Sequence, residues 1–153
     1  MLLAHGALAQ KPAPSGGAVK LKLPPLPPSM LEGLTAQLAD AAWTPASKVD
    51  AKFPPGAEVA LIGTDPVSTA PTFYMRMKPG YKVPLHAHEH LEYDTMVAGK
   101  GTLTLNGKKI AATPGTFVIV ASKVKHEFSC DSRVACVFVV RRSGPTEFIW
   151  GAK

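Results

Sequence analysis

Residues 80–99 read GYKVPLHAHEHLEYDTMVAG, and this stretch decides the fold of the chain. His86 and His88 place two imidazoles on one face of an expected strand, because successive side chains of a strand alternate between its faces. Glu92 joins that face if the alternation continues. If His86, His88 and Glu92 bind a metal ion, a fourth ligand must come from elsewhere in the chain. His126, which follows a later turn-bounded strand, is the candidate. A His-x-His pair alone is weak evidence for a metal site, since paired histidines on an exposed strand are common.

The sequence on both sides of this stretch predicts short strands. From about Val49 onward, short apolar segments are separated by turn signals, and Asn106-Gly107 between alternating segments predicts a hairpin with a type I′ turn. Residues 117–120 and 134–140 are apolar on both faces. Such strands must be covered on both sides, between two sheets or at a dimer interface. The expected class is all-β.

The spacing of the residues in 80–99 resembles the first sequence signature of the cupin superfamily. That signature is a glycine, five residues, His-x-His, three or four residues, Glu, six residues and a second glycine. Every spacing is met here, by Gly80, His86, His88, Glu92 and Gly99.

The second cupin signature is matched more loosely. It consists of a glycine, five residues, Pro-x-Gly, two residues, His, three residues and Asn. Gly115 and His126 keep the spacing, but Ala121, Lys123 and Cys130 stand where Pro, Gly and Asn are expected. These departures put the shape of the loop before His126 in doubt rather than the histidine itself.

The resemblance covers roughly residues 70–140 and implies both a fold and a cofactor. The implied fold is a double-stranded β-helix, the jelly-roll cupin barrel of two antiparallel sheets. The implied cofactor is one divalent transition-metal ion per chain, held by His86, His88, Glu92 and His126. Iron, manganese, nickel, copper, cobalt and zinc all suit three imidazoles and a carboxylate.

Several neighbours of the signature residues are candidates for a role in the site. Glu92 could act as a base if it loosens from the ion, and Asp94 is a second candidate catalytic carboxyl or a satisfied structural one. His90 is also an even number of positions from Glu92 and Asp94, which would put it on the same strand face, but it belongs to the expected loop at the barrel mouth. The candidate pocket-lining residues, for which core packing is the alternative, are His90, Tyr93, Met75, Met96, Phe117 and Phe128.

The remainder of the chain divides into four predicted segments. Residues 1–9 end in an Ala-x-Ala pattern and resemble the tail of a signal peptide, with a disordered Ala-rich terminus as the alternative. Residues 10–28 are rich in Pro and predict a tether, and residues 29–43 predict one short amphipathic helix. The barrel is expected over 49–150. Export to the periplasm or the medium is expected, with a cytoplasmic location as the alternative.

Composition limits the classes of partner. The 153 residues suit one domain, and no segment is apolar over a length that spans a membrane. The net charge of +6 comes from scattered basic residues, which indicates a solvated surface rather than a nucleic-acid interface. Anionic small molecules or acidic surfaces are the alternative partners.

The two cysteines are too few for a disulfide framework. Cys130 and Cys136 are interpreted as two small buried apolar side chains. A disulfide between neighbouring strands is the alternative if the protein is exported.

Three functions remain open from the sequence. The leading hypothesis is a metal-dependent enzyme acting on a small organic molecule, an oxidoreductase of the dioxygenase kind. The alternatives are a non-redox lyase, isomerase or hydrolase, and a binding module without turnover. The apolar strand 134–140 and the terminal Phe148-Ile149-Trp150 also predict a homodimer or, for the terminal aromatics, docking on the barrel.

Overall fold

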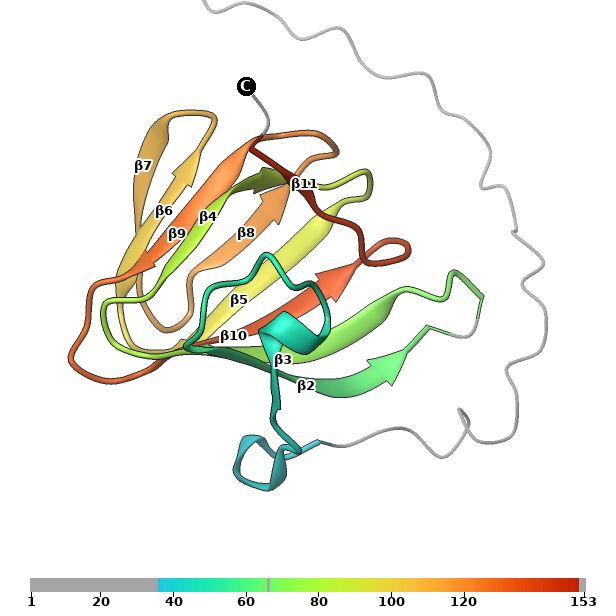
Figure 1. Ribbon diagram of the computed structural model, residues 1–153, viewed down its shortest axis with the longest axis horizontal. Helices are drawn as coiled ribbons and strands as arrows, with labels where there is room; N and C mark the ends of the chain where they lie inside the picture. Colours follow the sequence, from blue (N-terminus) through green and yellow to red (C-terminus); the bar gives the residue numbers. More distant parts are fainter. Residues whose placement is uncertain (1–35, 66, 152–153) are drawn as a thin grey trace, which may run out of the picture. The chain divides into compact units, whose positions relative to one another are not determined.

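The computed structural model describes residues 36–65 and 67–151, which belong to one compact unit. Two antiparallel sheets face each other (Figure 1). One sheet has the strand order β1-β2-β3-β10-β5-β8, and the other has the order β11-β4-β9-β6-β7. The jelly-roll prediction is confirmed.

The strands are short, as the frequent turn signals predict. The first sheet contains β1 (Thr44–Pro45), β2 (Ala57–Thr64), β3 (Pro71–Met77), β10 (Cys136–Arg142), β5 (Glu92–Ala98) and β8 (Phe117–Val120). The second contains β11 (Ile149–Trp150), β4 (Lys82–Ala87), β9 (His126–Cys130), β6 (Gly101–Leu105) and β7 (Lys108–Ala112).

Two turns show why the sequence bends where it does. Asn106 and Gly107 both have positive φ, 46° and 81°, and join β6 to β7 in the predicted hairpin. At Gly99, φ is 80° and a Cβ would lie 2.8 Å from the Ala135 carbonyl oxygen. Glycine is therefore required at this position of the first signature.

The hydrophobic core lies between the two sheets. Phe128 of β9 and Phe138 of β10 meet edge to face, with ring centroids 4.9 Å apart. Met77 and Met96 are almost fully buried beside them. Along β5 the inward positions are Glu92, Asp94 and Met96, so one apolar and two acidic side chains share the interior face. The core therefore continues directly into a polar cluster.

The predicted helix over residues 29–43 is not found in the part that the structure describes. Residues 36–43 contain only the short 3-10 helix η1 (Leu38–Asp40); a second one, η2 (Ala46–Lys48), follows β1. Tyr74 donates a hydrogen bond to the Ala36 carbonyl, and the Arg76 guanidinium lies 4.1 Å from the Trp43 ring centroid. The segment thus packs against side chains of β3. Residues 29–35, like the segments 1–9 and 10–28, lie outside the described residues.

The strand expected over 134–140 begins two residues later. Val134 is 62% exposed in a loop, whereas β10 runs in the middle of its sheet between β3 and β5. Both faces of β10 are therefore largely covered within the chain.

The cysteine prediction is corrected. Both cysteines are buried, but Cys130 at the end of β9 and Cys136 at the start of β10 form a disulfide, with Cα atoms 5.8 Å apart. The chain turns back between the two sheets over only five residues, which brings the two strand ends together. From the sequence this disulfide was the alternative to two unpaired buried cysteines.

The aromatic residues near the end of the chain dock on the barrel. Trp150 donates its indole N–H to Asp50 Oδ2 at 2.8 Å and stacks on Phe148, with centroids 5.2 Å apart. Phe53 meets both rings edge to face. No helix in the described part of the chain is long and apolar enough to cross a membrane.

Candidate metal centre

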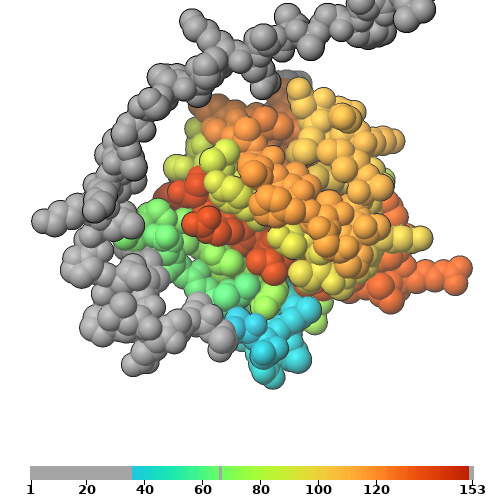
Figure 2. All heavy atoms as spheres, turned by 180° about the vertical axis from the view of Figure 1, so that it is seen from behind, coloured from blue at the N-terminus to red at the C-terminus, as the bar shows by residue number. Residues whose placement is uncertain are grey.

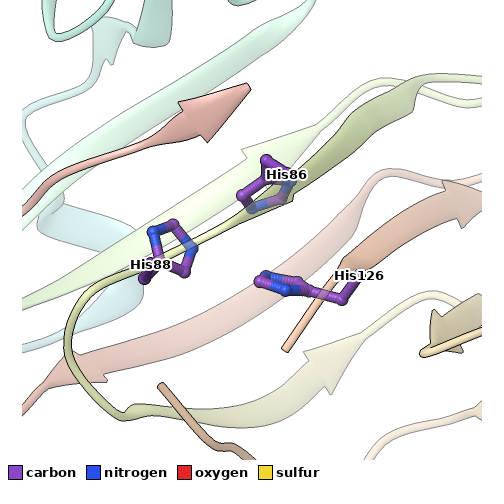
Figure 3. A group of neighbouring side chains, drawn as sticks. All are labelled: His86, His88 and His126. Atoms are coloured by element: carbon purple, nitrogen blue, oxygen red, sulfur yellow. The ribbon is translucent and has the colours of Figure 1, made fainter. Parts of the chain in front are cut away.

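The three histidines of the two signatures converge between the sheets. His86 lies on β4, His88 follows that strand, and His126 begins β9, where it is the register partner of His86. Figure 3 shows their rings turned toward one another. One ring nitrogen from each lies within 4.8 Å of the others, and all three residues are buried. Three buried imidazoles this close could hold a metal ion.

Backbone carbonyls fix which nitrogen of each ring carries the proton. The Nδ1 atoms of His86, His88 and His126 lie 2.7, 2.5 and 2.9 Å from the carbonyl oxygens of Pro84, Glu147 and Val124, respectively. A carbonyl only accepts, so each Nδ1 must donate. The Nε2 lone pairs are thus left for the interior, as in metal-bound histidines whose other nitrogen is held by a backbone oxygen.

The environment keeps two of these imidazoles neutral. Burial, followed by the nearby His126, lowers the pKa of His86 to about 3. Burial, followed by the Arg142 guanidinium, lowers the pKa of His88 to about 4. A neutral imidazole is the form that binds a metal ion, so these two ligands need no deprotonation at neutral pH.

Glu92 stands against this cluster, as the sequence predicts. It begins β5, and its carboxylate oxygens lie 3.4 Å from the Nε2 atoms of His88 and His126. Arg142 at the end of β10 forms an ion pair with Glu92 Oε2. Burial opposes the charged form of Glu92, but the Arg142 guanidinium outweighs it and holds the pKa of this carboxyl below its ordinary value.

The donor set fits a transition-metal ion. The Nε2 atoms of His88 and His126 are buried and have no hydrogen-bond partner, yet each faces a carboxylate oxygen at 3.4 Å. Two acceptors face each other favourably only with a cation between them, and the low pKa of His88 disfavours a proton there. Donors about 2.0–2.2 Å from one ion lie about 3.0–3.5 Å apart, so these contacts suit shared coordination.

Asp94 lies two residues beyond Glu92 on the same face. It is buried, and its Oδ1 atom has no hydrogen-bond partner. Burial, together with the neighbouring Glu92 carboxylate, raises the pKa of Asp94 well above its ordinary value. The two carboxyls of β5 therefore have opposite pKa shifts, and only Glu92 has the Arg142 guanidinium paired to it.

A cavity of about 220 Å³ opens beside the histidines. Its polar wall consists of His86, Glu92, Asp94, His126, Arg142 and Thr146. All the other lining residues are apolar: Val49, Phe53, Val59, Leu61, Pro71, Phe73, Met75, Met77, Val83, Leu103, Phe128, Phe138, Val140 and Phe148. His86, His126 and Glu92 thus lie in one polar wall of an otherwise apolar cavity.

The candidate pocket residues divide into two groups. Met75 and Phe128 line the cavity, whereas Met96 is fully buried in the core. Phe117 is 58% exposed, because it lies at an outward position of the edge strand β8. Tyr93 lies on the opposite face of β5 from Glu92, and the Arg141 guanidinium lies over its ring.

His90 lies in the loop before β5, where its ring packs on Gly144, and it does not line the cavity. The strand alternation that places His86 and His88 on one face ends before this position.

Sequence reasoning missed Arg142 and Phe148 as cavity residues. A signal for Arg142 exists, because Cys136, Phe138, Val140 and Arg142 alternate along β10 and all four are buried. Extending the inward face of this strand by one more position would have placed the arginine in the site. Phe148 has no local signal, since a five-residue segment after β10 brings it back to the barrel.

Comparison with known proteins agrees with this geometry. The family model described as "Cupin domain" matches residues 73–140. No curated protein sequence matches the chain.

Among solved structures, a cupin-2 domain protein from Rhodospirillum rubrum is 15% identical with a TM-score of 0.64, and the match covers 78% of this chain and 80% of that one. A predicted oxalate decarboxylase from Thermotoga maritima is 18% identical with a TM-score of 0.61, covering 76% and 99%. The polyketide cyclase RemF from Streptomyces resistomycificus is 16% identical with a TM-score of 0.62, covering 78% and 85%.

At these identities the solved structures show the fold alone. The family match, the two facing sheets and the buried histidines on the signature positions agree with one another. Residues 73–140 place the chain in the cupin superfamily, and its three buried histidines fit the metal-binding members of that superfamily.

Proposed function

We propose that the protein is a metal-dependent enzyme acting on a small organic molecule, an oxidoreductase of the dioxygenase kind. One observation carries the proposal: three imidazoles have their Nε2 atoms turned inward, and two of them, His86 and His126, line a mostly apolar cavity together with Glu92. A metal ion held there is reachable from a mostly apolar space. An organic substrate bound in this cavity would lie next to the ion.

The chain's own residues would divide the work. His86, His88, His126 and Glu92 would hold the ion, and the apolar walls would orient the substrate and exclude water. When bound, a six-coordinate ion with four protein ligands supplies two open positions for dioxygen or a chelating substrate. Glu92 is also placed to take a proton from a group bound in the cavity, since its carboxylate lines it.

A non-redox lyase, isomerase or hydrolase is the second candidate, and Asp94 favours it. Its buried Oδ1 has no partner, it lines the cavity, and its raised pKa suits a carboxyl that donates a proton. The names of two similar structures, a predicted oxalate decarboxylase and a polyketide cyclase, also describe reactions other than oxygenation. A binding cupin without turnover is the third candidate.

Elemental analysis of the purified protein, followed by oxygen-uptake screening, separates these candidates. About one iron, copper, manganese or nickel ion per chain with substrate-dependent oxygen uptake supports the dioxygenase. Zinc alone, with no oxygen uptake in any reconstituted form, supports the non-redox enzyme. No metal ion even after reconstitution contradicts both, and metal without turnover of any screened compound supports the binding module.

We also propose export to an oxidising compartment. The Cys130–Cys136 disulfide supports this location, because such bonds persist outside the reducing cytosol. Fractionation of cells that produce the full-length chain tests it. Recovery of the protein in the cytosolic fraction with both thiols alkylatable would contradict the proposal.

We propose a homodimer as well, formed through the edge strand β8 pairing with a second copy. Phe117 and Ile119 point outward on this strand and are 58% and 54% exposed. Figure 2 shows the orange segment that includes β8 at the surface seen from behind. The strand has no charged side chain of the kind that usually protects a sheet edge. Light scattering at high concentration should give twice the chain mass, and a monomer would contradict the dimer.

A further inference from the structure

Arg142 is more completely buried than its ion pair requires. It is the last residue of β10, is 3% exposed, and lines the cavity together with Glu92. Only Nη2 contacts Glu92. The Nε and Nη1 atoms are buried and have no hydrogen-bond partner among the described residues. Two donors of this buried guanidinium are therefore left unused by the described residues.

Unpartnered donors of a buried charge are unfavourable. Leaving a buried polar group without a partner costs about 1–3 kcal/mol, and more for a charged one. Asp94 does not relieve Arg142, since Asp94 Oδ1 is itself without a partner. Both planar forks of a guanidinium that match a carboxylate, Nε with Nη2 and Nη1 with Nη2, include the atom that pairs with Glu92, so Nε and Nη1 are each available as a single donor. An acceptor that enters the cavity would therefore be bound where the protein provides none.

The size and the apolar walls of the cavity determine which ligands fit, apart from their anionic group. Its volume of about 220 Å³ exceeds the roughly 150 Å³ apolar cavity that binds benzene. The wall away from the polar cluster is formed by apolar side chains, among them Phe73, Phe128 and Phe138. Phe148 lies under the Arg142 guanidinium, with its ring centroid 5.4 Å from Cζ. A ring or a short branched chain with one anionic end fits these walls.

We infer that the ligand of this cavity is a small carboxylic acid with an apolar body, whose carboxylate accepts a hydrogen bond from a donor of Arg142 that Glu92 leaves free. This inference deepens the proposed function, on which it rests for the metal ion beside the ligand. The guanidinium acts directly on the ligand and also holds Glu92, so both roles must be separated by experiment.

The first experiment uses a matched pair of probes on the wild-type protein. Phenylacetate and phenylacetamide have the same ring and nearly the same shape but differ in charge. Their affinities are measured by calorimetry for the zinc-loaded protein and for the protein treated with a chelator. We expect the acid to bind at least about tenfold more tightly in both forms, since a charge-assisted hydrogen bond contributes about 1.5–3 kcal/mol.

Variants then assign the preference to Arg142. The double variant Arg142→Met/Glu92→Gln removes the buried ion pair as a pair, and it should bind acid and amide equally. Glu92→Gln alone keeps the guanidinium and should retain the preference for the acid. Because three histidines remain in both variants, their zinc content and circular dichroism report the fold independently of ligand binding.

Several results would overturn the inference. Equal affinities for the two probes, a preference seen only in the zinc-loaded form, or no binding of either probe would each exclude an Arg142 carboxylate site. A preference that persists in the double variant would do the same. The proposed function fails differently: a protein that takes up no metal ion but still prefers the acid contradicts the metalloenzyme and leaves the Arg142 site in place.

Discussion

Strands β9 and β10 have very different chemistry at their two ends. At one end, Cys130 and Cys136 join the strands by a disulfide, and both are almost fully buried. At the other end, β9 begins with His126 and β10 finishes with Arg142, whose side chains carry buried atoms without partners. The same two strands are therefore joined by a disulfide at one end and carry buried polar atoms without hydrogen-bond partners at the other. Unsatisfied groups concentrated at one end indicate function, because they reduce stability.

Metal binding should be lost when the polar end is altered. We expect His126→Ala to lower metal affinity by more than the roughly 10–100-fold that losing an outer hydrogen-bond partner of a ligand costs. The urea midpoint of the metal-free protein should fall little or rise, because an unsatisfied buried group is removed. Metal titration with a chelator competitor measures the effect. His90→Ala is the matched control, and equal affinities of the two variants would contradict the site.

Acid should destabilise the polar end of the metal-free protein. His86 and His88 have pKa values of about 3 and 4 in the fold, while in the unfolded chain they titrate near their ordinary value of about 6.5. The unfolded state then binds more protons below about pH 6.5, so stability falls as the pH is lowered through this window. At pH 5 each imidazole contributes up to about 2 kcal/mol to the loss.

Urea unfolding at pH 7 and pH 5 measures this loss. Asp94, whose pKa is raised, acts in the opposite direction, because its folded form holds a proton more tightly. The informative quantity is therefore the difference between wild type and His86→Gln, which should lose less stability between the two pH values. An identical loss of stability between pH 7 and pH 5 in both proteins would contradict the neutral state assigned to His86.

Opening the disulfide should affect stability and leave the metal site intact. The bond closes a short loop, with the two cysteines six positions apart. We expect Cys130→Ala/Cys136→Ala to lower the free energy of unfolding by about 2 kcal/mol, from the gain in chain entropy of the unfolded state. Urea unfolding and metal content are measured together. A loss of metal content without a loss of stability would show that the two strand ends are not separable in this way.

The smallest expected effect concerns the loop before His126. Lys123 has a φ of 63°, a value that L-residues other than Asn and Asp adopt at a cost of about 1–2 kcal/mol. Lys123→Gly removes this strain but adds entropy to the unfolded chain, so a net gain of up to about 1 kcal/mol is expected. The backbone N–H of Lys123 donates to the His88 carbonyl in any case. A melting temperature equal to or below that of the wild type would contradict the strain.

Lys123 also shows how far sequence reasoning reaches. The family signature has a glycine at this position, and its replacement raised doubt about the loop shape. The structure keeps the turn, with a lysine in the left-handed region that glycine favours. Spacing therefore predicted the place of His126 better than residue identity did, because the hydrogen bonds of the turn come from the backbone.

The metal ligands and the hairpin at Asn106-Gly107 were predictable because their signals are local. The spacing of the first signature predicted His86 and Glu92, but Glu92 begins β5 in the other sheet, so the strand alternation expected to join them does not continue. Two positive φ angles require the turn residues Asn106 and Gly107. The disulfide, Arg142 and Phe148 depend on which strand ends meet in space. That information lies in the pairing of β9, β10 and β11 with strands distant in the sequence.

Trp150 has a use beyond packing. Its ring centroid lies 5.3 Å from that of His86, while Trp43 lies on the other side of β3, beside Arg76 and Tyr74. An open-shell ion such as Cu²⁺ quenches indole emission over such short separations. With Trp43 replaced by Phe, the fluorescence of the remaining indole becomes an intrinsic optical readout of occupancy at the histidines, requiring no added dye and no knowledge of the substrate.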